Sequence, residues 1–366
     1  MSIDRGDMND GFPADASRLL ARGAADDVRA RRRLAAATAD LHLTEADRLD
    51  DRYRSALHHM IERLCALVEG DLRQFAARLL VSRGLPEPAL ALSEAPPVVF
   101  AVLRDAGLLG DAAFMRAMLG RTGLALLAER LPVAATTAER SSLLVRLVEH
   151  RDGVVAAAAS ALMAADARRR DAIDGAAPRN DIAAEQQHQL VWWAAATLHH
   201  AFASASDDSA AFDRALTEAA ERALAVHDEG ERAEAAATRL VAMLAPQPDE
   251  RGELLCEALA DRRPGLFVAL LAQAIGLEFD SVRDVLIDPE SDRLWIMLRA
   301  AALDREAIAR LGLALCEAAP GRDVEAFADQ LDAINAVTPA AAEAALAPLY
   351  RHADLRAALD VLGARS

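Results

Sequence analysis

The sequence contains no lysine, and all 41 of its Lys-or-Arg residues are arginine. Several mechanisms therefore have no place in it: a Schiff-base lysine, the phosphate-binding lysine of a P-loop, and the ATP-pairing lysine of a protein kinase. Aromatic residues make up only 4% of the 366 residues, and isoleucine and threonine are scarce. Alanine and leucine favour helices, whereas β-branched and aromatic residues favour strands. The composition therefore predicts an all-α protein.

Familiar catalytic and metal-binding motifs are also missing. There is no GxSxG, HExxH or GxGxxG motif and no EF-hand spacing, so we expect a non-catalytic protein without cofactor or metal. The only cysteines, Cys65, Cys256 and Cys316, lie far apart and form no CxxC pair. This usage suits a reducing cytoplasm, with the thiols buried as small core side chains.

Nothing in the sequence indicates a membrane protein. The first residues are acidic and rich in turn formers, unlike a signal peptide. The longest stretch without Asp, Glu or Arg, residues 186–206, carries too many histidines, glutamines and serines for a bilayer-spanning helix. We expect a cytoplasmic protein.

The formal net charge of −16 also limits the partners. An acidic chain repels nucleic acid, whose binding depends on neutralising phosphates, and attracts basic protein segments instead. Aspartates flank both arginine runs, residues 31–33 and 168–170, and we expect these runs on solvated helix faces. Three more acids, Asp288, Glu290 and Asp292, gather in a predicted turn before a helix, where they suit the helix dipole.

Helices follow one another along the chain, separated by short Gly-, Pro- or Asp-containing joints. A capping-box pattern at residues 44–47 predicts a helix over about 45–69, ended by Gly70 and Asp71, and a second pattern at 136–139 precedes another helix. Longer helices are expected at about 182–204, 209–227 and 231–245. We divide the chain into a flexible tail (1–12), an N-terminal bundle with helix pairs (13–180), a long-helix segment (181–247) and a C-terminal short-helix domain (248–366).

Two segments indicate repeats. Residues 71–80 (DLRQFAARLL) and 153–162 (GVVAAAASAL) each resemble the second helix of a HEAT-type repeat, in which small residues allow close helix packing. The second segment has Val155 where the pattern usually has Arg. Short helices alternating with tight turns are typical of an α-solenoid, so we expect a HEAT-like array of helix pairs.

A wider resemblance covers about two-thirds of the chain. The runs VVFAVLRDAGLLGDAAFMRAML, LALLAERLP and LLVRLVEHRDGVVAAAASAL, with FVALLAQAIGLEFDSVRDVLID and LWIMLRAAALDREAIARLGLAL towards the C-terminus, resemble an uncharacterised alphaproteobacterial family of helical-repeat proteins, domain of unknown function 2336. The resemblance implies a helical fold. It implies no activity, because none is established for the family.

Two adjacent histidines, His58 and His59, lie within the predicted 45–69 helix. Adjacent residues on a helix point about 100° apart, so the pair cannot hold one metal ion, and no other histidine stands at i, i+4 spacing. A solvent-facing histidine on a long helix is also what a response regulator phosphorylates. Leu57-His58-His59 faintly resembles the start of a histidine-kinase phosphoacceptor motif, although Glu62, Arg63 and Leu64 follow where asparagines are expected. An ordinary surface role is the more common one for such histidines.

Two other features suggest alternatives. Trp192 and Trp193 point to different flanks of one helix; packing between helices is their commoner use, and a partner or homodimer interface is the other. Residues 268–287 match a helix-turn-helix template, with a turn at Gly276. Its would-be DNA-reading helix carries three acids and only one arginine, Arg283, so binding of phosphates is unfavourable.

The hypothesis that best fits these features is a non-catalytic cytoplasmic adaptor or scaffold, active in signalling or regulation. Stacked helix pairs expose long surfaces that recognise proteins, and we expect this outer surface to carry the function. The alternatives are a histidine-phosphotransfer protein using His58 or His59, and DNA binding through residues 268–287.

Overall fold

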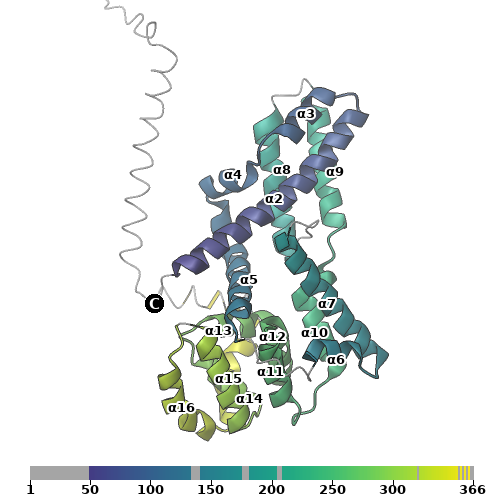
Figure 1. Cartoon of the computed structure of the whole chain (residues 1–366). Coiled ribbons are helices and arrows are strands. Elements are labelled where there is room, and N and C mark those ends of the chain that lie inside the picture. Colours follow the sequence, from purple (N-terminus) through teal and green to yellow (C-terminus); the bar gives the residue numbers. More distant parts are fainter. Residues whose placement is uncertain are drawn as a thin grey trace, which may run out of the picture. The chain divides into compact units, whose positions relative to one another are not determined.

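The computed structural model describes residues 49–132, 141–174, 181–203, 208–319, 321–352 and, near the C-terminus, 355, 356, 358, 359 and 362, with side chains of 170–174 left out. All regular structure within these residues is helical, as the composition predicts (Figure 1). In chain order the elements are α2 (Asp51–Ser82), α3 (Pro86–Glu94), α4 (Val99–Asp105), η1 (Leu108–Gly110), α5 (Ala112–Arg130), α6 (Leu143–Val148), α7 (Gly153–Asp174), α8 (Ala184–Phe202), α9 (Ser209–Ala225), η3 (Glu229–Glu231), α10 (Ala233–Leu244), α11 (Arg251–Ala260), α12 (Pro264–Ile275), α13 (Phe279–Ile287), α14 (Arg293–Ala300), α15 (Arg305–Ala318), α16 (Val324–Ala336), α17 (Pro339–Leu346) and η4 (Ala347–Tyr350).

The described residues from Arg52 onward belong to one compact unit, and the contacts reported below lie within it. In the part of the chain that the structure describes, no helix combines the length and apolar character needed to cross a bilayer.

Helix α2 is longer than the sequence indicates. It continues for 32 residues through Gly70 and Asp71, where we expected a break, so that expectation was wrong. A glycine inside a helix costs only about 1 kcal/mol relative to alanine. Burial on both sides of Gly70 offsets this cost, because Val68 and Leu72 are both buried on the same apolar stripe. Residues 51–82 therefore form one continuous helix.

Buried side chains form two separate cores. The first joins α2, α3, α4 and the start of α5 to α8 and α9. The second joins the end of α5, α6 and α7 to α10 and the helices that follow it. Helix α5 therefore contributes to both, with Phe114 in the first core and Leu124 in the second. Each core combines segments from both sides of residue 180, and the domain division expected from the sequence remains a prediction.

Small residues bring the helices of the second core together. Helices α7 and α10 pack side by side (Figure 1) and both bury alanines, among them Ala159 and Ala236. Alanine favours the helix and lets two backbones approach closely. Neighbouring helices also pack as pairs, for example α8 with α9, α11 with α12 and α15 with α16. The solenoid arrangement of such pairs remains a prediction.

Several other helix boundaries agree with local sequence signals. The long helices expected near 182–204, 209–227 and 231–245 correspond to α8, α9 and α10. Ser142 caps α6 by accepting a hydrogen bond from the Val145 amide, at 3.4 Å. The two capping-box patterns, the expected tail and the first arginine run lie outside the described residues.

Candidate functional site

A cavity of about 660 Å³ lies where helices of the two cores meet. Its walls come from α2, α5, α7 and α10 and from the segment joining α11 to α12. Much of the lining is apolar, including Met60, Leu64, Leu124, Leu162 and Leu266. The volume lies in the range typical of small-molecule sites.

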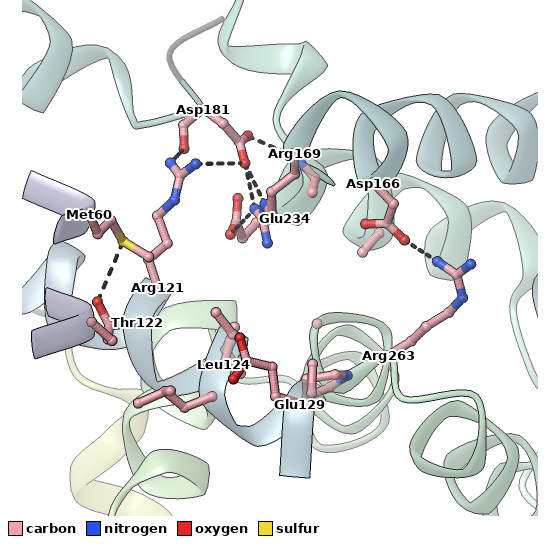
Figure 2. Close-up of a pocket in the computed structure, with 18 of the residues that line it drawn as sticks. Met60, Arg121, Thr122, Leu124, Glu129, Asp166, Arg169, Asp181, Glu234 and Arg263 are labelled. Atoms are coloured by element: carbon pink, nitrogen blue, oxygen red, sulfur yellow. Dashed lines mark hydrogen bonds and ion pairs between the residues drawn. The ribbon is translucent and has the colours of Figure 1, made fainter. Parts of the chain in front are cut away.

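Four charged side chains gather on one wall (Figure 2). Arg169 of α7 lies 2.6 Å from Asp181 Oδ2 and 2.6 Å from Glu234 Oε1. The other oxygen of Asp181 accepts a 3.1 Å hydrogen bond from the Ala233 amide at the start of α10. Arg121 reaches the group from α5 and donates a short hydrogen bond to the Asp181 carbonyl. Four separate segments thus meet in one network.

The charged groups of this network shift one another's pKa values. Burial raises the pKa of Glu234, but the positive charges of Arg169 and Arg121 outweigh it and bring this pKa down to about 2. Burial lowers the pKa of Arg121, and the charge of Asp181 only partly opposes the effect. Burial lowers the pKa of Arg169 as well, but the negative charges of Glu234 and Asp181 outweigh this effect and raise the pKa above its usual value. Glu234 and Arg169 therefore remain charged at neutral pH.

Two polar groups of this wall are poorly satisfied. Glu234 Oε2 is buried and has no hydrogen-bond partner among the described residues. Arg121 donates to the Asp181 carbonyl, but the nearest contact of its guanidinium with the Asp181 carboxylate is 3.6 Å. An unpaired acceptor and an incompletely paired cation thus lie on the same wall.

A second group of charges lines another part of the cavity. Arg263 forms an ion pair with Asp166 of α7, as Figure 2 shows. The neighbouring Arg262 has a left-handed backbone (φ 57°) and donates hydrogen bonds to the carbonyls of Ala128 and Glu129 at the end of α5. These contacts tie α11 and α12 to α5 beside the cavity.

An acidic surface lies elsewhere, at the junction of α13, α14 and α16. It consists of five exposed carboxylates: Asp288, Glu290, Asp292, Asp323 and Glu325. The buried Arg322 holds its two segments together by donating to the carbonyls of Leu286 (3.0 Å) and Asp288 (2.7 Å). The Arg322 guanidinium also lies 5.5 Å from the centre of the Trp295 ring. Packing thus collects acids that the sequence separates by more than thirty positions.

The histidine pair lies on an exposed part of α2. The ring of His58 meets Phe100 edge to face, with centroids 4.9 Å apart, and His59 Nδ1 lies 3.7 Å from Glu62. His59 also borders the cavity. Both rings are accessible to solvent, and phosphorylation of either remains a prediction. Among the residues described, no group of three or more His, Cys, Asp or Glu side chains could hold a metal ion.

Trp192 and Trp193 are both half-buried on α8. Trp193 packs edge to face against Phe114 with ring centroids 6.1 Å apart, and Trp192 Nε1 donates to His188 Nε2 at 3.2 Å. The two indoles thus meet different neighbours, and a partner or homodimer interface at this position remains a prediction.

The proposed helix-turn-helix corresponds to α12 and α13, with Gly276 in a left-handed conformation (φ 68°) at the turn. Its arginine, Arg283, is buried and paired with Asp280 (2.6 Å) and Asp284 (2.7 Å). Arg283 therefore offers little charge to a phosphate, although DNA binding through this pair is untested.

Sequence reasoning missed the network at the cavity. Arg168–Arg170 was expected on a solvated face, but Arg169 is engaged with Asp181 and Glu234, so this expectation was wrong for that residue. Arg168 is 40% exposed and lies near Glu231. No local spacing links Arg121, Asp181 and Glu234, because each comes from a different segment.

Comparison with known proteins identifies the family. The model of the family described as "Uncharacterised protein conserved in bacteria (DUF2336)" matches residues 98–347, so the chain belongs to this family. No curated protein matches the chain. No solved structure matches it either. The alphaproteobacterial and HEAT-like parts of the resemblance remain predictions.

Proposed function

We propose that this DUF2336 protein is a non-catalytic, cytoplasmic adaptor that binds basic segments of partner proteins, in signalling or regulation. The observation that carries the proposal is the acidic surface of Asp288, Glu290, Asp292, Asp323 and Glu325. A basic segment would be attracted to this surface electrostatically.

The organisation of the acidic surface supports a binding role. Arg322 fixes one segment against the other by donating hydrogen bonds to main-chain carbonyls. Its charge also acts on Asp288 and Asp292, so a single buried cation faces five exposed carboxylates. The net charge of −16 adds a long-range field of the same sign. Positively charged partners would therefore be steered to the protein, with an association rate that falls as salt is added.

The pKa values of Glu234 and Arg169 suit binding better than proton transfer. General acid–base catalysis is most efficient when the pKa of the catalytic group lies near the working pH. The pKa of Glu234 is about 2, and that of Arg169 is raised by its two carboxylate partners. These groups favour recognition of a bound molecule over exchange of protons with it.

Affinity capture with the full chain tests the adaptor. The wild-type protein and the variant Glu290→Gln/Asp292→Asn/Glu325→Gln are each used to capture proteins from extract of the native host, with quantitative mass spectrometry. We expect at least one partner with a basic segment to bind the wild type. Its binding to the variant should be about threefold to about a hundredfold weaker, because exposed charge pairs contribute ~0.2–1 kcal/mol each and three are removed.

The control variant Glu87→Gln/Glu94→Gln/Asp105→Asn removes the same number of exposed charges from α3 and α4. It should retain the partner. Equal loss from both variants would show that only net charge matters, and capture of no specific partner by the wild type would contradict an adaptor.

The exposure of the histidine pair favours a second candidate, phosphotransfer through His58 or His59. Incubation with phosphorylated response regulators should then leave an acid-labile label that His58→Ala or His59→Ala removes. An adaptor would retain partner binding in both variants. DNA binding through residues 268–287 is the third candidate, and absence of a retarded species in a low-salt gel shift would exclude it.

A further inference from the structure

The cavity between the two cores has the size and lining of a ligand site. Its volume is about 660 Å³, and leucine and methionine side chains provide most of its apolar contacts. Apolar walls with a few convergent polar groups are typical of sites for small organic molecules. An occupant with an apolar body would bury that body against α2 and α5.

The charges around the cavity are balanced. Five arginines and five acids line it: Arg63, Arg121, Arg169, Arg262, Arg263, Glu129, Asp166, Asp181, Glu234 and Asp261. A ligand with a large net charge of either sign would leave part of this lining uncompensated, at a cost that is greatest beside the buried members of the lining. A ligand that is neutral overall but carries both signs of charge avoids this cost.

The two poorly satisfied groups define where such charges would lie. Glu234 lines the cavity, but its Oε2 is covered by neighbouring atoms and has no donor among the described residues. An unpaired buried acceptor costs about 1–3 kcal/mol, so a movement of this side chain that brings Oε2 to a donor on the ligand would be favourable. Arg121 has five N–H donors, and its hydrogen bond to the Asp181 carbonyl uses only one of them. One ligand that offers an ammonium to Glu234 and a carboxylate to Arg121 would satisfy both.

We propose that this cavity binds an apolar zwitterion of the amino-acid or short-peptide class, with its carboxylate at Arg121, its ammonium at Glu234 and its side chain against the Leu64–Leu124 wall. This inference goes beyond the adaptor function and does not depend on it. A free amino acid and a dipeptide share the same two charged ends, and they differ only in the separation of those ends and in size.

The position of the two charged residues gives binding a structural consequence. Arg121 lies on α5, whose first half belongs to the first core, and Glu234 lies on α10 in the second. A zwitterion bound between them would join the two cores through one molecule. Because it binds only the folded chain, it should raise the unfolding temperature as its concentration rises.

Isothermal titration and thermal unfolding of the full chain test the proposal with four probes. L-Phenylalanine and L-leucyl-L-phenylalanine carry both charges. N-acetyl-L-phenylalanine lacks the ammonium, and L-phenylalaninamide lacks the carboxylate. We expect at least one zwitterion to bind and both capped analogues to bind at least about tenfold more weakly, since each leaves one buried partner unsatisfied. Whether the amino acid or the dipeptide binds better identifies the size of the ligand.

Variants then locate the binding. Ala125 is exposed and lines the cavity, whereas Ala113 is exposed near the start of the same helix and does not line it. Ala125→Trp should obstruct the cavity and weaken binding strongly without removing a charge, and Ala113→Trp should bind as the wild type does. Glu234→Gln should selectively reduce the preference for probes with an ammonium, and Arg121→Gln the preference for probes with a carboxylate.

Three results would overturn the proposal. The first is that neither zwitterion binds at millimolar concentration. The second is that a capped analogue binds as tightly as its zwitterion. The third is that Ala125→Trp leaves binding unchanged, which would place any binding outside the cavity. Because Ala125→Trp removes no charged side chain, this last result is decisive even if the charge variants fail to fold.

Discussion

Glu69 and Arg73, one turn apart on α2, form a buried ion pair with 2.6 Å between Glu69 Oε1 and Arg73 Nη2. The Glu69 carboxylate also accepts hydrogen bonds from the amides of Val98 and Val99, where α4 begins. Arg73 donates to the carbonyl of Leu92, in the last turn of α3, and to the carbonyls of Ala95 and Pro96, which follow that helix. One charge pair thus satisfies the backbone between two helices, and the carboxylate suits the positive end of α4.

Replacement of Glu69 by alanine should destabilise the protein strongly. Arg73 would remain buried without its carboxylate, and loss of one partner of a buried pair costs about 3–5 kcal/mol. Urea unfolding measures the change. Glu62→Ala, an exposed site on the same helix, should change stability by no more than about 0.5 kcal/mol. Similar small effects at both positions would show that the buried pair is unimportant.

The stability of the protein should depend on Glu234 at acid pH. Its pKa is lowered from 4.5 in the unfolded chain to about 2 in the folded one. The resulting stabilisation is therefore fully present above pH 4.5 and is lost as the pH falls through about 2. The difference in unfolding free energy between wild type and Glu234→Gln should shrink within that window. A difference that stays constant across it would contradict the lowered pKa.

A side chain at Gly312 should lower the free energy of unfolding. It is buried on α15, and a methyl group there would overlap the ring of Phe327 on α16. Because Phe327 is itself buried, Gly312→Ala should cost about 1–3 kcal/mol in the free energy of unfolding, measured by urea titration.

The matched control is Gly265→Ala. A side chain there meets no atom within 4 Å, so the change should be neutral or stabilising by up to about 1 kcal/mol. Adding Phe327→Leu should reduce the cost of Gly312→Ala, and no reduction would place the strain elsewhere.

The cysteine thiols should be unreactive until the chain unfolds. All three are buried, and burial raises the pKa of Cys65 to about 12 and that of Cys256 to about 11. The thiolate is the reactive form, so an aromatic disulfide reagent at neutral pH should modify the native protein far more slowly than the urea-unfolded chain. Cys65, with no exposed surface, should react last, and rapid native modification at Cys65 would contradict its burial.

Much of the fold could be predicted because helix formation is governed by nearby residues. The apolar stripe of Tyr53, Leu57, Met60, Ile61, Leu64, Leu67 and Val68 predicts which face of α2 is buried. Leu57, Ile61, Leu64 and Val68 are buried, and the other three are half-buried. The three cysteines were likewise predicted to be core residues, and they are. The expected break at Gly70 failed because tertiary burial outweighs a small local preference.

The candidate site could not be predicted in the same way. Helical periodicity indicates that Arg169 and Glu234 lie on particular helix faces, but it does not state which faces meet. Arg322 presents the same difficulty. Its position in the sequence, near several acids, does not indicate that its guanidinium is buried against the carbonyls of Leu286 and Asp288.

The sequence by itself determined an all-α chain of amphipathic helices, because composition and the 3.6-residue period act over a few turns at most. Only the tertiary structure decided that Arg121, Arg169, Asp181 and Glu234 share one wall of a cavity. The physical reason is that the free energy of bringing distant helix faces together depends on the fit of their side chains. No residue carries that information alone.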